Sequence, residues 1–182
     1  YPWACFNSMS WGDPDNDGDL DVFLPGLLGV PDGDWWETDQ DGPWVLGSEN
    51  LLLLNQGGEF EPLVETLGPS TAPSLSFLSA FSDRNNDGRM DLLITSDRSA
   101  LSWWPNGVFL SNHGNDPQSV PSFEPPNEDL GMPNAVSGMG MATSDFNEDG
   151  YLDYCLTDFA RRLACFQSTG PEGYIDISLT TG

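Results

Sequence analysis

A short acidic motif occurs three times in this 182-residue chain, and it constrains the fold more than any other feature of the sequence. The copies are DPDNDGDLD (13–21), DRNNDGRMD (83–91) and DFNEDGYLD (145–153), which share the pattern D-x-[DN]-x-D-G-x-x-D. We number the positions of this motif 1 to 9. Recurrence at an interval of roughly 60–70 residues indicates an internal repeat in which each copy occupies the same place in one structural unit.

The segments around the motif repeat as well. Before it lies a stretch with small residues that predicts a strand (5–12, 75–82, 137–144), and after it a short apolar run that predicts a strand buried on both faces (22–26, 92–97, 154–159). Two copies continue with an Asn/Gly turn and Phe-Glu-Pro (50–62, 107–125), which predicts a hairpin into a fourth strand; residues 162–179 match more loosely. Each repeat is therefore expected to contain about four strands, with the acidic loop joining the first to the second.

The predicted fold class is all-β, and a repeat of four strands is typical of a β-propeller blade. The whole chain (1–182) is expected to be a partial propeller with blade-like repeats at about 1–66, 67–130 and 131–182, the first with an insertion at 25–49. Three blades cannot close a ring, since propellers have roughly 4–8 blades. We therefore expect a larger propeller, or partner chains that complete it, with two copies forming six blades as one solution. Residues 174–182 are either the last strand of the third blade or the first of a following module.

The motif carries the features of a loop that binds a hard divalent cation: oxygen-bearing side chains at positions 1, 3, 5 and 9, and a glycine that turns the chain at position 6. Position 7 is expected to offer a backbone carbonyl, so its side chain varies. The expected metal ligands are Asp13, Asp15, Asp17, Asp19 and Asp21; Asp83, Asn85, Asp87, Arg89 and Asp91; and Asp145, Asn147, Asp149, Tyr151 and Asp153. Oxygen ligation favours Ca²⁺, one ion per repeat, over zinc, copper or the more rigidly coordinated Mg²⁺.

Two other kinds of loop share features of this motif. An EF-hand needs a glutamate at position 12, where this chain has Leu24, Ile94 and Leu156, so the loops are not EF-hands. Ordinary turns between strands also favour Asp, Asn and Gly. Three copies in the same register, each followed by an apolar strand, favour the cation site.

The charge of the chain excludes some classes of partner. It has 29 acidic and 5 basic residues, a net charge of −24, and this surface repels nucleic acid and attracts cations or basic partners. No apolar run approaches the roughly 20 residues that span a membrane. The sequence opens on YPWACFNSMS without an initiator methionine, which we interpret as a processed or truncated start, so the missing signal peptide is uninformative.

The repeated motif, followed by an apolar strand and a further strand ending in N-x-G, resembles the FG-GAP/VCBS repeat of integrin-α-like β-propellers. Residues 138–159, GMGMATSDFNEDGYLDYCLTDF, are especially similar to blades of bacterial secreted proteins of the ASPIC/UnbV type. The similarity covers nearly the whole chain apart from 25–49. It implies calcium-stabilised blades, an extracellular or periplasmic location, and adhesion or assembly in place of catalysis. The family commonly closes seven blades, whereas this chain has three repeats.

The cysteines, the histidine and the tryptophans leave alternatives open. Cys155 and Cys165 bracket a turn and are compatible with a cross-strand disulfide or with two buried thiols, and Cys5 is then unpaired or bonded outside the chain. His113 is interpreted as a surface turn residue, because it is the one histidine of the chain and no cysteine lies near it in the sequence. Five tryptophans could fill the core between blades, form a protein interface or form a glycan platform: Trp35, Trp36, Trp44, Trp103 and Trp104.

These observations predict a calcium-binding, non-catalytic β-propeller module outside the cytoplasm, secreted and acting in adhesion, protein–protein interaction or a larger assembly. The alternative is a fragment of a secreted propeller enzyme that acts on polysaccharide. The acids Glu37, Asp39 and Asp41 could serve such an enzyme, but acids are so abundant in this chain that the cluster carries little information.

Overall fold

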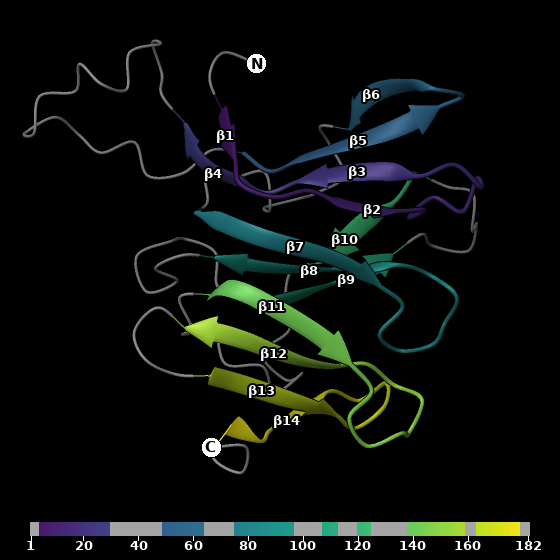
Figure 1. The fold of residues 1–182 in the computed structure, drawn as a ribbon. Helices are drawn as coiled ribbons and strands as arrows, with labels where there is room; N and C mark the ends of the chain where they lie inside the picture. Colours follow the sequence, from purple (N-terminus) through teal and green to yellow (C-terminus); the bar gives the residue numbers. More distant parts are fainter. Residues whose placement is uncertain are drawn as a thin grey trace, which may run out of the picture.

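A computed structural model describes residues 4–29, 49–63, 75–96, 107–112, 120–124, 138–158 and 163–178. These residues form three four-stranded antiparallel sheets and one strand pair (Figure 1). The protein is therefore all-β in its described part. None of the described residues forms a helix with the length and apolar character needed to cross a membrane.

Each sheet is built from strands in the order of the sequence. The first sheet contains β2 (Ser10–Gly12), β3 (Asp21–Leu24), β5 (Leu51–Gln56) and β6 (Glu59–Leu63). The second contains β7 (Ser76–Ser82), β8 (Asp91–Ser96), β9 (Gly107–Asn112) and β10 (Ser122–Glu124). The third contains β11 (Gly138–Ser144), β12 (Asp153–Asp158), β13 (Leu163–Ser168) and β14 (Tyr174–Asp176). Tyr174–Asp176 is thus the fourth strand of the third sheet, as one of the two interpretations of this segment predicts.

The first repeat departs from the expected pattern. Residues 5–12 were predicted as one strand, but β1 (Ala4–Phe6) and β2 are separate, and β1 pairs with β4 (Gly26–Gly29) in its own two-stranded sheet. β4 lies inside the predicted insertion 25–49. Pro25 stands between β3 and β4, and because proline has no N–H to donate, a strand tends to be interrupted there.

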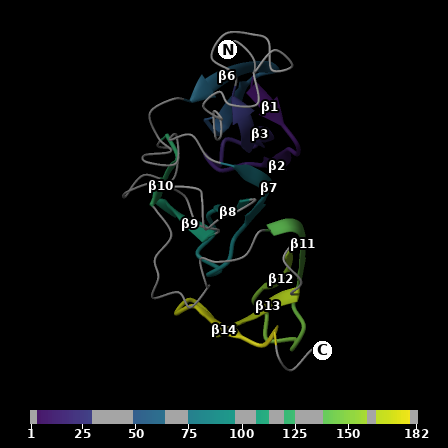
Figure 2. The ribbon, with the colours of Figure 1, turned by 90° about the vertical axis from the view of Figure 1, so that its left-hand side faces the viewer.

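The three sheets lie one beside the next in chain order, with β1 and the first sheet at one end and the third sheet at the other (Figure 1). Their first strands are neighbours: β7 contacts β2 on one side and β11 on the other. Seen from the side, the outer strands β6, β10 and β14 fan apart (Figure 2). This radial arrangement, close at the first strands and open at the fourth, is compatible with a fragment of a β-propeller.

Two apolar clusters hold the sheets together. The cluster between the first and second sheets consists of Phe23, Leu52, Leu54, Leu92, Ile94 and Phe123, with Leu63 and Phe81 at its margin. The cluster at the third sheet consists of Leu93, Tyr154, Leu156, Ala164, Phe166 and Tyr174, with Met141 and Leu152. Because side chains alternate along a strand, β8 sends Leu92 and Ile94 to one cluster and Leu93 to the other. All six residues of β8 are buried, as expected for a strand covered on both faces.

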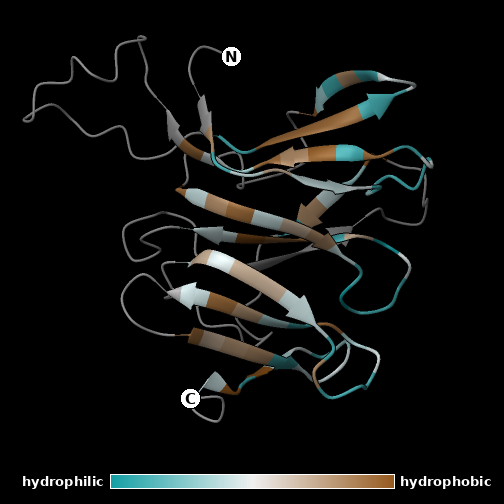
Figure 3. Ribbon diagram, in the orientation of Figure 1, coloured by the Kyte–Doolittle hydropathy of each residue, from teal (hydrophilic) through white to brown (hydrophobic). Residues whose placement is uncertain are grey.

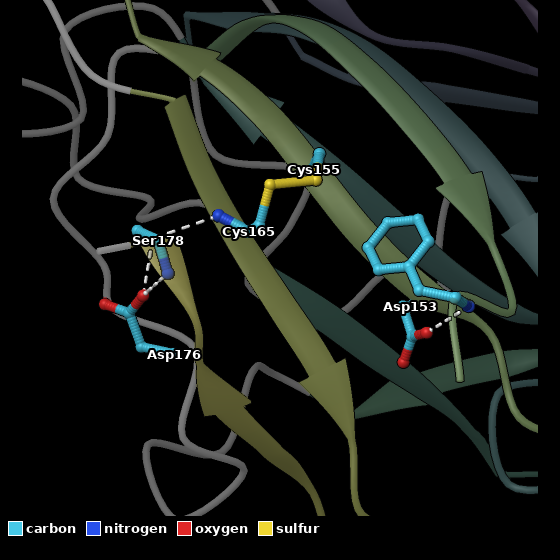
Figure 4. The surroundings of a disulfide bond; sticks show 6 residues. Asp153, Cys155, Cys165, Asp176 and Ser178 are labelled. Carbon is cyan, nitrogen blue, oxygen red and sulfur yellow. Dashed lines mark hydrogen bonds between the residues drawn. A yellow bond between two sulfur atoms is a disulfide. The ribbon is translucent and has the colours of Figure 1, made fainter. Parts of the chain in front are cut away.

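A disulfide joins Cys155 and Cys165, which face each other in the register of β12 and β13 (Figure 4). Its Cα–Cα distance is 4.1 Å, and the two residues are 10 apart in the sequence. The Cys165 N–H donates to Ser178 Oγ at 3.0 Å, and Ser178 in turn bonds to Asp176, so the end of the described chain is attached beside the disulfide (Figure 4). Of the two alternatives for this cysteine pair, the structure has the disulfide and not two buried thiols.

Several predictions fall on residues outside the described ranges. They concern His113, the acids Glu37, Asp39 and Asp41, the five tryptophans of the insertion and of the second repeat, and the boundaries between the predicted repeats. They stay predictions.

The contact between the first and second sheets depends on Gly12. A Cβ at this position would lie 2.7 Å from Phe81 Cδ2 and 2.8 Å from Met90 Sδ, closer than atoms approach without displacement. We expect Gly12→Ala to lower the free energy of unfolding by about 1–3 kcal/mol, as measured by urea denaturation.

Gly140→Ala is the matched control. Its Cβ would meet Thr157 Oγ1 at 2.6 Å, but Thr157 is exposed and can rotate away. The loss should stay below about 0.5 kcal/mol. Equal losses at the two glycines would contradict the role assigned to Gly12.

Candidate metal centre

The three acidic loops lie along one edge of the molecule. Each joins the first strand of its sheet to the second, and in Figure 1 all three project from the same side. They form a hydrophilic margin beside the apolar strands (Figure 3). The repeat therefore presents the same group of oxygen atoms three times at one edge.

The backbone is the same in all three loops. Position 4 has a left-handed conformation at Asn16, Asn86 and Glu148, with φ of 56°, 57° and 59°. Position 6 is glycine with positive φ of 94°, 84° and 90° at Gly18, Gly88 and Gly150. Glycine adopts this conformation without a steric cost and asparagine tolerates it better than most residues. Glu148 has neither advantage.

The carboxylate at position 1 closes each loop. In the first loop Asp13 accepts the N–H of Asp17 at 3.0 Å and the N–H of Gly18 at 3.1 Å. Asp83 accepts the N–H groups of Asp87 and Gly88 at 3.0 and 2.8 Å, and Asp145 those of Asp149 and Gly150 at the same distances. One side chain thus holds positions 5 and 6 in place in each copy.

Positions 3 and 5 add further bonds within the loop. The N–H of position 5 also reaches the side-chain oxygen of Asp15, Asn85 or Asn147, at 3.3 Å in each loop. The carboxylate of position 5 accepts the N–H of position 7, at 2.8 Å for Asp19, 2.9 Å for Arg89 and 2.9 Å for Tyr151. The expected ligand positions are therefore part of one small turn.

Position 9 distinguishes the first loop from the other two. Asp91 Oδ2 accepts the N–H of Arg84 at 3.2 Å, and Asp153 Oδ2 accepts the N–H of Phe146 at 2.6 Å; both donors occupy position 2. In the first loop position 2 is Pro14, which has no N–H. Asp21 Oδ1 accepts the N–H of Asn55 at 2.8 Å, but Asp21 Oδ2 is buried and has no hydrogen-bond partner.

The first loop also gathers carboxylates closely. One oxygen each from Asp13, Asp15 and Asp21 lie within 4.8 Å of one another. Burial raises the pKa of Asp21 to about 7, and the charges of Asp15, Asp17 and Asp13 add to this effect. The pKa of Asp15 is raised by burial first and then by the charge of Asp17. Burial and neighbouring negative charges thus act together on these carboxyl groups. An all-oxygen cluster with an unpartnered buried oxygen fits a hard cation.

The structure thus brings together Asp13, Asp15 and Asp21 of the expected ligands in the first loop. In the second and third loops the amide groups of Asn85 and Asn147 donate to Asp87 Oδ2 and Asp149 Oδ2, at 3.0 and 2.8 Å. Position 9 is fully buried in the first and third loops and nearly so in the second, whereas Asp19 is exposed.

Two loop positions were missed by sequence reasoning. Position 4 carries the left-handed turn, and asparagine in two of the three copies was the signal for it. Position 2 is treated by the motif as variable, yet Arg84 is 1% exposed, and its Nη2 donates to Pro171 O at 2.6 Å in the third repeat. Its guanidinium carbon lies 5.5 Å from the centre of the Tyr174 ring. No signal in the sequence separates this buried arginine from Arg89, which is only partly buried.

Contacts also join one loop to the next. The amide of Asn86 donates to Gly150 O at 3.1 Å, which connects the second loop to the third. The N–H of Asp13 points to Met90 Sδ at 3.4 Å, which connects the first to the second. The loops are therefore neighbours that share contacts, as repetition of one unit along an edge requires.

Repeated four-stranded antiparallel sheets, each with the same aspartate-rich loop between its first and second strands, define a class of repeat protein built from blade-like β-sheets. Residues 83–156 match the family model of the FG-GAP-like repeat. The matched range begins at position 1 of the second loop and includes the whole third loop, and over this range the resemblance to the FG-GAP repeat is confirmed. No curated protein matches the chain.

The strain at position 4 of the third loop can be tested. We expect Glu148→Asn to raise the free energy of unfolding by about 1 kcal/mol, because the left-handed conformation costs an ordinary residue roughly this much. The reverse change in the first loop, Asn16→Glu, should lower it by a similar amount. Urea denaturation of both variants with a chelator present measures the backbone effect, and a loss of stability in Glu148→Asn would contradict the assignment.

Proposed function

We propose that the chain is a calcium-binding module of a β-propeller that acts outside the cytoplasm in adhesion, protein–protein interaction or assembly, without catalysis. The observation that carries the proposal is Asp21 Oδ2, a buried carboxylate oxygen without a partner, next to the carboxylates of Asp13 and Asp15. Burying a charged group without compensation is costly. A divalent cation supplies the missing positive charge.

The chemistry of the donors favours calcium among the common cations. All side chains at positions 1, 3, 5 and 9 offer oxygen, which suits Ca²⁺ and Mg²⁺ better than zinc or copper. The residues that would hold the ion in the first loop are Asp13, Asp15, Asp17 and Asp21, with the Asp19 carbonyl. The second and third loops would use the matching positions, because their backbone and hydrogen bonds follow the same pattern. Calcium accepts the irregular geometry of such a turn more readily than magnesium does.

The proposed location has two supports. The disulfide Cys155–Cys165 is typical of proteins from oxidising compartments. FG-GAP repeats are typical of extracellular proteins, and the match over residues 83–156 includes such a repeat. An extracellular or periplasmic module would meet calcium at concentrations that fill loops of moderate affinity.

Thermal melting in calcium and in chelator tests the proposal. A site filled at 100 times its Kd adds about 2.7 kcal/mol, so one filled loop should raise the Tm by about 5–10 °C. Asp21→Asn should lose much of this gain in Tm. Asp19→Asn is the control and should keep the gain, because the Asp19 side chain is exposed and only its backbone carbonyl is proposed to hold the ion. Equal Tm values in calcium and chelator for the unaltered protein would overturn the calcium site.

The partner proposed for the module is another blade-like sheet, since an outward face of the first sheet repeats aromatic positions that pack between two sheets in the second. Phe81, two residues before its loop, contacts Phe23 of the first sheet and Phe123 of its own, both at 6.4 Å between ring centres. The matching pair in the first sheet is Trp11 and Phe60, 6.2 Å apart. These two rings are 52% and 44% exposed. An exposed aromatic pair at interface positions is suited to receive a further sheet.

Replacing Trp11 tests this face. Trp11→Ala should leave the stability of the isolated chain within about 1 kcal/mol, because the ring is half exposed, and weaken any association of the chain by at least tenfold, as measured by sedimentation. Phe81→Ala, the same position where the first and second sheets meet, should cost about 2 kcal/mol of stability, because the ring is partly buried between them. Unchanged association of the Trp11 variant would exclude this face as the docking surface.

A further inference from the structure

We propose that the three loops are not equivalent cation sites, and that Pro14 makes the first loop the one that binds its ion most tightly and fills first. This inference rests on the proposed function, since it assigns an order to the same sites. It concerns position 2 of the motif, which is Pro14, Arg84 and Phe146 in the three copies. Nothing in the repeat pattern assigns this position a role.

The first step of the argument is the hydrogen bond that Pro14 removes. Arg84 and Phe146 donate their N–H groups to Oδ2 of the position 9 aspartate in their own loops, at 3.2 and 2.6 Å. Asp91 and Asp153 therefore have this oxygen bonded before any ion arrives. Proline at position 2 cannot donate, and Asp21 Oδ2 has no other partner although the residue is fully buried.

The second step is that the N–H group of position 2 and a cation bind the same carboxylate oxygen of position 9. In the second and third loops the empty site is already stabilised at position 9, so an ion adds less there. In the first loop Asp21 Oδ2 has no hydrogen bond in the empty site, so the ion would be its first partner. An unsatisfied buried group carries a large cost, and relief of that cost appears as binding affinity.

The third step is the number of charges at the ligand positions. The first loop has aspartate at positions 1, 3, 5 and 9, whereas the other two have asparagine at position 3. A further carboxylate raises the affinity of a loop for calcium. The second loop also has Arg89 at position 7, and its positive charge opposes a cation. Both the hydrogen bonds and the charges place the first loop ahead of the others.

The three turn glycines provide a separate signal for each loop. The N–H groups of Gly18, Gly88 and Gly150 all bond to the position 1 carboxylate, at 3.1, 2.8 and 2.8 Å, so each amide should respond when its own loop takes an ion. The experiment titrates the ¹⁵N-glycine-labelled, chelator-treated 182-residue chain with calcium and follows these amides by NMR. We expect Gly18 to move at a calcium concentration about tenfold lower than Gly88 and Gly150, which corresponds to about 1.4 kcal/mol.

A pair of reciprocal variants isolates the proline. Pro14→Ala restores an N–H at position 2, and the lead of Gly18 should shrink by several fold. Phe146→Pro removes the N–H from the third loop, and Gly150 should then move at lower calcium. Phe146→Ala keeps the N–H and removes the ring, which is 46% exposed, so it should leave the Gly150 midpoint unchanged.

The outcomes separate the two proposals. If the three amides move together, or if Gly88 or Gly150 leads, the order is overturned and calcium binding itself stands. If Gly18 leads but Pro14→Ala does not change its midpoint, the assignment to Pro14 is overturned. If none of the three amides moves at millimolar calcium, the proposed function fails and this inference fails with it.

Discussion

The rest of each repeat depends on the hydrogen bonds that the carboxylate at position 1 of the loop accepts. By accepting two successive backbone N–H groups, it fixes the turn between the first and second strands. The register follows: the residue before position 1 pairs with position 9 in all three sheets, as Gly12 with Asp21, Ser82 with Asp91 and Ser144 with Asp153. A slip of one residue would turn every apolar side chain of the second strand to the wrong face.

The fixed register explains why neighbouring sheets fit together. Position 10, directly after the loop, is Leu92 in the second sheet and Tyr154 in the third, and both pack toward the preceding sheet. Position 11 is Phe23 in the first sheet and Leu93 in the second, and both pack toward the following one. The same alternation in every copy produces interfaces that repeat along the chain. The polar loop therefore determines the apolar contacts between sheets.

Much of this organisation could be predicted from the sequence, because it is local and repeated. The motif, the buried strand after it and the Phe-Glu-Pro hairpin each depend on residues near one another in the chain. The break between β1 and β2 could not be predicted, because it depends on pairing with β4, about twenty residues later. The burial of Arg84 could not be predicted either, because it depends on contacts with Pro171 and Tyr174 of the third repeat. Contacts between repeats leave no periodic signal in a short window.

The limits of the motif are most evident at position 2, which the pattern treats as free. The main-chain N–H there bonds to the aspartate at position 9 in the second and third loops, and among the common residues only proline removes this donor. Pro14 is such a case, and the result is visible at Asp21, seven residues away in the sequence and fully buried. Motif identity describes the side chains that a loop can offer to an ion. Whether those side chains are already satisfied without the ion depends on backbone donors, and sites that look the same in sequence can therefore differ in affinity.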